Sequence, residues 1–375
     1  MAMVHHSGKD YEVAVGEAAA NFQRRLEEMI HASVPRVEKV IEQVQKDIPD
    51  DTLVNGNRLE FTENDNRLTI WNKGQDEGEA IATAIHPHAF GQIVGRTGIP
   101  NFPAYARELV KGEPWQRELL ADNLNEVYDH SSGRFLTRVV RGELRGFLSD
   151  SYKRMNTAPM LDTFMGLMKQ YGARPVDGFA LQTKERVRAI LPMIFEPYPG
   201  EYLAFGAQFG NSNYGDGAFE YSQISMRAWC TNFAISEDIL HKIHLGAKLP
   251  DNLAFSQRTI DLNTQAVQSA LKDVAHLALG APAINGYLAM VRKANEEKVE
   301  PAQINTWVKK NLNKDEGERV KDVFSSADVE KLPPGQTSWR FSNAVSWLAN
   351  EVEDEHRKLE LQELAGTLLP KDKAA

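Results

Sequence analysis

GRFLTRVVRGELRGFLSD (133–150) and TAPMLDTFMGLMKQYG (157–172) are the two stretches that decide the predicted fold class. The first holds two runs of mostly apolar residues joined at Arg141-Gly142, which predicts a β-hairpin. The second has apolar residues at helical spacing and ends in glycine, which predicts one helix. Four more strands are predicted after it, around VDGFALQ (176–182), ERVRAILP (185–192), EYLAFGAQFG (201–210) and GAFEYSQISMRAWCT (217–231). This order predicts an α+β fold in which a central antiparallel sheet is crossed by a helix.

Helical patterns flank this central unit on both sides. Apolar residues recur at helical spacing over residues 10–48, and a hairpin is predicted around the turn TENDN (62–66) before further helices at 86–128. From SEDILHKIHLG (236–246) onward the pattern is almost entirely helical. We therefore expect three units, which are a helical N-terminal region with a short hairpin (1–130), the antiparallel core (131–250) and a helical C-terminal region (251–375).

Length and composition are those of a globular protein. The chain has 375 residues, of which 42% are hydrophobic and 25% are charged, and this excludes wholesale disorder. The longest charge-free apolar stretch of the C-terminal half, 277–291, is shorter than the roughly 20 residues that span a bilayer, and the N-terminus has no apolar signal segment. A single cysteine, Cys230, excludes a disulfide framework. These features predict a cytoplasmic protein without a membrane segment.

Basic residues concentrate in one window of an acidic chain. The whole sequence carries a net charge of −9, whereas residues 134–188 hold eleven basic and five acidic residues. Six aromatic residues are interleaved with them, which is typical of a groove that neutralises phosphates and stacks bases. Arg186 and Arg188 lie two residues apart on a strand, so both point away from the core side expected for Val187 and Ala189. In the alternative interpretation, the arginines pair with the protein's own carboxylates and the rings fill the core.

The loop NSNYGD (211–216) extends the predicted interface. Backbone amides in such a loop can bind a phosphate, although an ordinary hairpin turn would use the same residues. We expect Tyr152 to stack on a base. The predicted nucleic-acid-binding set is Arg134, Arg138, Arg141, Arg145, Tyr152, Lys153, Arg154, Lys184, Arg186, Arg188, Asn211, Ser212 and Asn213.

No catalytic residue, cofactor or metal site is predicted. The chain lacks a P-loop, a GxGxxG run, a GxSxG elbow and an HExxH helix, which are the signatures of common ATPases, dehydrogenases, serine hydrolases and zinc proteases. Weaker alternatives are a metal site, a nuclease centre and a cysteine nucleophile. The residues that would form them are Glu237 with His241 and His244, His86 with His88, Asp50 with Glu296, Glu297 and Lys298, and Cys230.

Four stretches in chain order carry a resemblance to a known family. They are RGELRGFLSDSYKRMN (141–156), GAQFGNSNYGDGAF (206–219), MRAWCTN (226–232) and SWRFSNAVSWL (338–348). Together they resemble the phage and plasmid "domain of unknown function 932" family. The resemblance implies an accessory protein encoded near replication and recombination genes, and it implies no reaction. The expected sheet with a crossing helix also resembles the core of phage single-strand annealing proteins.

These observations lead to one expected function and one main alternative. We expect a non-catalytic protein that binds single-stranded DNA in recombination or replication, including strand annealing, and that forms a homo-oligomer. The alternative is a phage or plasmid accessory protein that binds a host or phage protein through its helical arms, with the basic window serving as internal ion pairs. An enzyme acting on nucleic acid through a site without a known signature is the third possibility. The first two hypotheses differ in whether the arginines of 134–188 lie on an open face.

Overall fold

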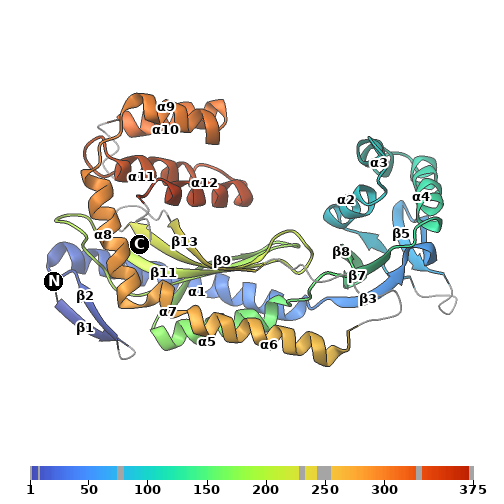
Figure 1. Cartoon of the computed structure of the whole chain (residues 1–375), viewed down its shortest axis with the longest axis horizontal. Helices are drawn as coiled ribbons and strands as arrows, with labels where there is room; N and C mark the ends of the chain where they lie inside the picture. Colours follow the sequence, from blue (N-terminus) through green and yellow to red (C-terminus); the bar gives the residue numbers. More distant parts are fainter. Residues whose placement is uncertain are drawn as a thin grey trace.

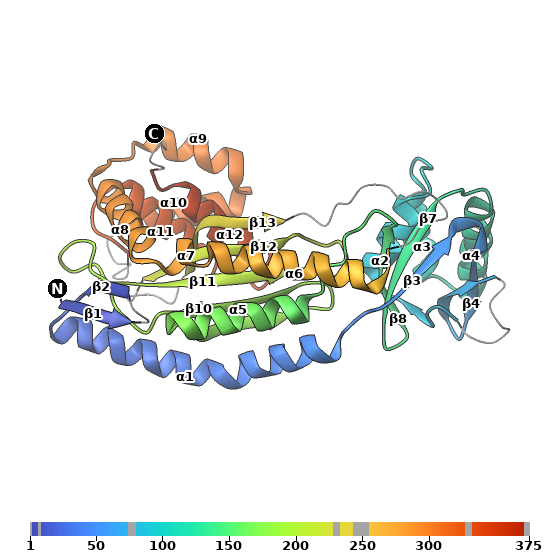
Figure 2. The same cartoon turned by 60° about the horizontal axis from the view of Figure 1, so that its bottom comes forward.

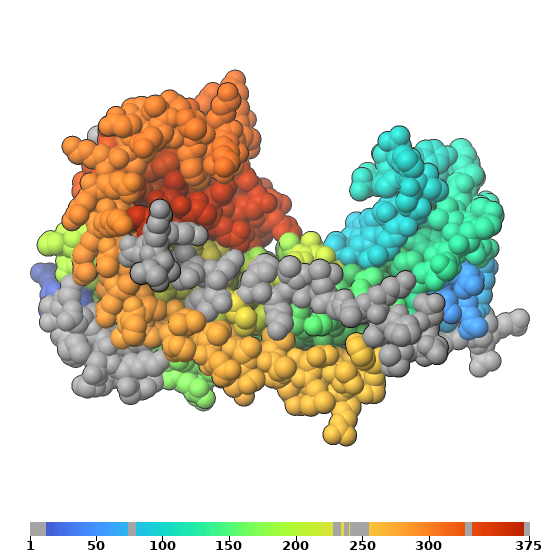
Figure 3. Space-filling view, in the orientation of Figure 1, coloured from blue at the N-terminus to red at the C-terminus, as the bar shows by residue number. Residues whose placement is uncertain are grey.

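The computed structural model describes residues 2–6, 9–73, 80–227, 233–242, 255–326 and 332–370. These residues form three parts, which we call the platform, the distal lobe and the C-terminal lobe (Figure 1). The two lobes rise from the same side of the platform, and the space-filling view shows a hollow between them (Figure 3).

A five-stranded antiparallel sheet forms the centre of the platform. Its strand order is β13-β12-β11-β10-β9. The strands are β9 (Arg174–Ala180), β10 (Glu185–Ile190), β11 (Leu203–Asn211), β12 (Phe219–Arg227) and β13 (Phe233–Lys242). Every residue of β11 is buried, because helices cover both faces of the sheet.

Helices of the platform lie against one face and one edge of this sheet. Along one face run α5 (Thr157–Tyr171) and α6 (Gln257–Val274), followed by α7 (His276–Leu279) and α8 (Ala281–Glu296) (Figure 1). Phe164 of α5 packs there against Phe209 and Tyr221. The long helix α1 (Glu17–Lys46) packs against edge strand β9 and runs the length of the platform (Figure 2). Before α1, β1 (Ala2–His6) and β2 (Lys9–Val13) form a hairpin.

The distal lobe contains most of residues 50–149. Its sheet has the order β3-β7-β8-β6, and a separate hairpin and three helices complete it. The elements are β3 (Asp50–Asn55), η1 (Gly56–Arg58), β4 (Leu59–Asn64), β5 (Arg67–Asn72), β6 (Ala84–Ile85), α2 (Pro87–Gly95), α3 (Phe102–Lys111), α4 (Pro114–Asp129), β7 (Arg134–Val140) and β8 (Glu143–Ser149). Phe135 stacks on Phe147 at 4.7 Å between ring centroids, and Tyr128 contacts both rings edge-on. This aromatic cluster gives the lobe a core of its own.

Four helices form the C-terminal lobe. They are α9 (Pro301–Asn311), α10 (Lys314–Ser325), α11 (Ser338–Leu348) and α12 (Glu355–Thr367). Helix α12 lies on the sheet face opposite α5, where Leu359 joins a core with Ile190 and Ile224. The C-terminal lobe therefore covers the face of the sheet to which Arg186 and Arg188 point.

The expected α+β fold with helical flanks is confirmed, and so is the hairpin at Arg141-Gly142. Both turn residues have positive φ, 52° and 79°, as a two-residue hairpin turn of type I′ requires. Helices α6 to α12 likewise confirm the helical pattern of the C-terminal region, within the residues described from 255 onward.

Three details of the expected fold are wrong. Hairpin β7–β8 pairs with β3 and β6 instead of joining the central sheet, so residues 134–149 belong to the distal lobe and not to a 131–250 core. The segment expected as a helix at 236–246 is strand β13 up to Lys242, because pairing with β12 outweighs the local helical pattern. Helix α1 begins at Glu17, after the N-terminal hairpin, and not at residue 10.

No single helix of the described chain is long and apolar enough to cross a membrane. The segments Gln257–Leu279 and Ala281–Glu296 satisfy the length and composition test only as a pair, which is bent by 45°.

Candidate nucleic-acid interface

Most guanidinium groups of the predicted basic window are paired with the protein's own carboxylates. Arg138 is fully buried, and its Nε lies 2.7 Å from Asp51. Arg145 is bound by Asp47 and Glu143, each at 3.0 Å. The remaining pairs are Arg134 with Asp150, Arg141 with Asp47, Arg154 with Asp51, Lys184 with Asp216, Arg186 with Glu220 and Arg188 with Asp177. The prediction that this window forms an open basic face is therefore wrong for these residues apart from Arg141, whose side chain stays exposed.

Four basic residues of the window remain accessible, and two of them, Lys169 and Arg174, are exposed but lie outside the predicted binding set. Lys153 is exposed, and the side chain of Arg141 is 63% exposed although it pairs with Asp47. Arg141 contributes little stability through this pair, since water screens its exposed guanidinium group. Arg141 lies in the turn between β7 and β8, Lys169 lies near the end of α5 and Arg174 lies at the start of β9, so these cations belong to separate elements.

Tyr152 is not positioned as a stacking platform. Its hydroxyl donates a hydrogen bond to the Ser212 carbonyl oxygen at 3.1 Å. Burial raises the pKa of Tyr152 above its ordinary value, as expected for a phenol withdrawn from water. The prediction that this ring stacks on a base is wrong in the described conformation.

The NSNYGD loop is internal as well. Asn211, Ser212 and Asn213 are all buried. Asn213 Oδ1 accepts hydrogen bonds from the backbone N–H of Thr157 at 3.0 Å and from its hydroxyl at 3.1 Å. Ser212 Oγ accepts from the N–H of Asp216 at 3.0 Å. These side chains are used to shape the loop, so the predicted phosphate contact is not supported by their geometry.

The same loop joins the platform to the distal lobe. Arg138 of β7 donates to the Asn213 carbonyl oxygen at 2.6 Å, and Gln92 of α2 donates to the Tyr214 carbonyl oxygen at 2.9 Å. A Cβ added to Gly146 of β8 would lie 3.3 Å from Tyr214 Cα, so the two backbones pack closely. We call this contact the inter-lobe joint. Gly146, Asn213 and Tyr214 lie in the stretches that carry the family resemblance, and in this structure they help to hold two parts of the chain together.

Glu185 is a buried carboxyl group at this joint that the sequence patterns did not indicate. The Thr157 hydroxyl is hydrogen-bonded to Glu185 Oε2 at 3.0 Å. Burial is the main cause that raises the pKa of Glu185 to about 8; Asp47 acts in the same direction, whereas the hydrogen bond with Thr157 and the charges of Arg145 and Arg138 act against it. The side chain is therefore neutral at pH 7, which avoids the cost of a buried unpaired charge.

A second basic cluster, absent from the predicted set, lines a cavity of about 680 Å³ in the distal lobe. We call this cavity the distal groove. Arg67, Arg107 and Lys111 are exposed at it, and none of the three pairs with a carboxylate in the described part of the chain. Its apolar lining residues are Leu68, Ala84, Ile85, Pro87, Phe90 and Val110.

Two further charged groups line the distal groove and are already paired. Arg117 is buried, donates to Asn66 Oδ1 at 2.8 Å and lies 3.6 Å from Glu63. Glu143 is held by Arg145. The three exposed cations therefore dominate the charge of the groove. Sequence reasoning missed them because they come from β5 and α3, which are far apart along the chain and outside the 134–188 window.

The weaker metal and nuclease alternatives gain no support from the described residues. No group of three or more His, Cys, Asp or Glu side chains among them is arranged to hold a metal ion. His86 Nδ1 accepts from the backbone N–H of His88 at 3.1 Å, which caps α2. Asp50 belongs to β3, whereas Glu296 ends α8 at the other end of the molecule (Figure 1). Cys230, Glu237, His241 and His244 lie outside the residues whose side chains are described.

Comparisons of the chain with protein-family models, with curated proteins and with solved structures found no match. The resemblance to the phage and plasmid family stays a prediction.

Proposed function

We propose that the chain binds single-stranded nucleic acid, and that the distal groove is the contact surface. The observation that carries this proposal is a set of three exposed cations, Arg67, Arg107 and Lys111, beside an apolar-walled cavity and without carboxylate partners in the described chain. Unpaired cations attract phosphates through counterion release. The arginines of 134–188 that pair with carboxylates are already neutralised within the protein.

The apolar walls favour a single strand over a duplex. A cavity of about 680 Å³ lies in the roughly 300–1,000 Å³ range of sites that enclose a small molecule, and a nucleobase is smaller than that. Only an unpaired base can leave its stack to enter such a cavity, while the flanking phosphates stay at the rim. Duplex DNA presents phosphates to the same cations and leaves the cavity empty.

The test is the affinity for a labelled oligo(dT), measured by fluorescence anisotropy at 50 and 200 mM salt. About three phosphate contacts give a log–log slope near −2, at roughly −0.7 per phosphate on a single strand, so the affinity should fall about 20-fold. Replacing Arg67, Arg107 and Lys111 together with glutamate should abolish binding at 50 mM salt.

A matched control keeps this result specific. Glutamate at Lys298, Lys309 and Lys310, which are exposed in or beside the C-terminal lobe, makes the same change in net charge and should preserve most of the affinity. Equal losses in the two triple variants would show that only net charge matters. Unchanged affinity in the distal-groove variant, or no binding of the wild-type chain, would refute the proposal.

We include a role in recombination or replication in this proposal because of the family resemblance, and strand annealing by a homo-oligomer because a sheet crossed by a helix resembles the core of phage single-strand annealing proteins. Two complementary oligonucleotides should then anneal faster in the presence of the protein than in its absence. Binding without any acceleration would restrict the function to single-strand binding.

Binding of a protein partner through the distal lobe is the second candidate. It is favoured by Trp115 on α4, which is 61% exposed, and by Leu119 one turn later, which is 38% exposed. The internal pairing of the basic window also agrees with that hypothesis. Trp115→Ala should leave oligonucleotide affinity unchanged, and a loss of affinity equal to that of the distal-groove variant would mean that Trp115 contacts the nucleic acid.

A further inference from the structure

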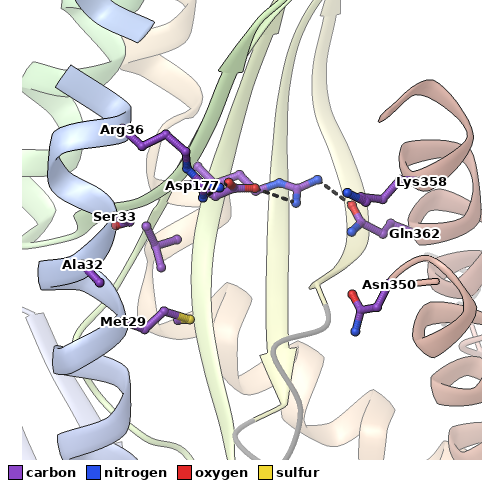
Figure 4. A pocket seen from close by; sticks show the side chains of 10 residues that line it. Met29, Ala32, Ser33, Arg36, Asp177, Asn350, Lys358 and Gln362 are labelled. Carbon is purple, nitrogen blue, oxygen red and sulfur yellow. Dashed lines mark hydrogen bonds and ion pairs between the residues drawn. The ribbon is translucent and has the colours of Figure 1, made fainter. Parts of the chain in front are cut away.

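A second cavity lies between α1, the platform sheet and α12, far from the distal groove. Its volume is about 490 Å³ (Figure 4). Met29, Ala32, Ser33 and Arg36 line it from one face of α1, at the spacing that places side chains on a common side of a helix. Figure 4 shows Lys358 and Gln362 of α12 on the opposite side, with Asn350 nearby. We call this cavity the α1–α12 slot.

Cations outnumber carboxylates in the slot. Arg36, Arg188 and Lys358 line it, and Asp177 is the only carboxylate among its lining residues. Asp177 pairs with Arg36 and also lies 3.3 Å from Arg188, so one carboxylate serves two guanidinium groups. Glu355 holds Lys358 at 2.7 Å from outside the lining set.

The excess of positive charge in the slot is energetically unfavourable because one of its cations, Arg188, is buried. Its side chain is only 6% exposed and is held by Gln208 at 2.8 Å and by Gln362 at 2.5 Å, both of which are neutral. Burial is the main cause that lowers the pKa of Arg188 to about 10; the positive charges of Arg186 and Arg36 act in the same direction, and Asp177 and Glu355 act against it. Two guanidinium groups that share the carboxylate of Asp177 carry a net positive charge, and a further anion beside them relieves the cost of placing that charge in the slot.

We propose that the α1–α12 slot binds the phosphate group of a small molecule. The phosphate would lie among Arg36, Arg188 and Lys358, and the amide of Gln362 can donate to it. Met29, Ala32 and Val176 leave an apolar side against which a small organic body fits. Because the cations come from α1, the sheet and α12, a bound phosphate would tie the C-terminal lobe to the platform. This site is separate from the distal groove and does not depend on nucleic-acid binding.

The test measures thermal unfolding of the whole chain with increasing inorganic phosphate, with sodium chloride adjusted to hold ionic strength constant. Binding to the native state alone raises the midpoint in a saturable way, as RT ln(1 + [L]/Kd). A parallel titration with glycerol phosphate shows whether the bound phosphate group belongs to an organic ester or to free inorganic phosphate. Tighter binding of the ester assigns an organic phosphate to the slot, whereas tighter binding of inorganic phosphate assigns the free ion.

Variants at the rim localise the effect. Arg36→Gln with Lys358→Gln should remove the saturable rise, whereas Lys39→Gln, an exposed position on the same helix, should retain it. Asn350→Asp is the second variant. Asn350 is exposed and lines the slot, so this change adds a negative charge without disturbing the core and should weaken phosphate binding at least tenfold.

Two results would overturn the proposal. One is a rise that never saturates and is equal in all variants, because phosphate also strengthens apolar burial in any protein by exclusion from its surface. The other is the absence of any rise with either phosphate. Neither result depends on whether oligo(dT) binds, so this proposal and the proposed function can fail separately.

Discussion

Arg188→Glu provides the sharpest test of whether the basic window is internal. If Arg188 lay on an open nucleic-acid-binding face, reversing its charge would abolish binding and leave stability nearly unchanged. In the structure, Arg188 is buried beneath α12, with Asp177, Gln208 and Gln362 around its guanidinium group. We therefore expect the substitution to destabilise the fold instead.

The expected magnitude follows from these contacts. Removing one partner of a buried ion pair costs about 3–5 kcal/mol. The glutamate also faces Asp177, and both glutamines lose a partner, at about 1–3 kcal/mol for each buried group left unsatisfied. Such contributions do not add fully, so we expect a loss of about 4 kcal/mol in the free energy of unfolding. This corresponds to roughly a thousandfold change in the unfolding equilibrium.

Urea denaturation followed by far-UV circular dichroism measures this loss. Arg174→Glu is the matched control, because Arg174 lies in the neighbouring strand β9, is exposed and makes the same change in charge. An exposed substitution of this kind should change stability by no more than about 0.5 kcal/mol. If Arg188→Glu is as mild as the control and also abolishes oligonucleotide binding, the reasoning from burial is refuted.

Three other predictions test separate parts of the structure. Glu185 keeps its proton up to a pKa of about 8 in the folded state but loses it near 4.5 when unfolded, so stability should fall as pH rises between these values. The slope is at most about 1.4 kcal/mol per pH unit, and Glu185→Gln should remove it from urea midpoints measured between pH 5 and 8. An unchanged pH profile would mean that the carboxyl group is not buried as described. Gly206→Ala places a Cβ 2.1 Å from the Ala189 carbonyl oxygen and should cost about 1–3 kcal/mol, so a neutral result would contradict the register of β10 and β11. Arg145→Ala should lower the free energy of unfolding by about 3 kcal/mol or more, because the Arg145 side chain is only 9% exposed. Arg141→Ala should lower it by less than about 1 kcal/mol, because the Arg141 side chain is 63% exposed. Equal losses of stability in the two variants would contradict the burial of Arg145.

Local patterns predicted the elements of the fold well. The turn at Arg141-Gly142, the helix from Thr157 to Tyr171 and the orientation of Val187 and Ala189 toward a core are all confirmed. Each depends on residues close together in the chain, such as apolar spacing or a turn that accepts positive φ. Local chemistry was sufficient for these features.

The surroundings of those elements were not predictable in the same way. Arg186 and Arg188 do point away from the core side of their strand, but that face is covered by α12, about 170 residues later in the chain. Asp47 and Asp51, which hold Arg145 and Arg138, precede them by almost 100 residues. A single sequence shows which side a residue faces and does not show what covers that side. The same limitation concealed the distal groove, whose cations are combined only by folding.

Arginine-selective labelling with phenylglyoxal, read by mass spectrometry with and without oligo(dT), tests the central claim most directly. We predict that Arg67 and Arg107 are modified readily and that the oligonucleotide protects both, while Arg138 and Arg188 stay unmodified in either state. Rapid modification of Arg138 and Arg188 that the oligonucleotide suppresses would contradict the claim and return the interface to the central sheet.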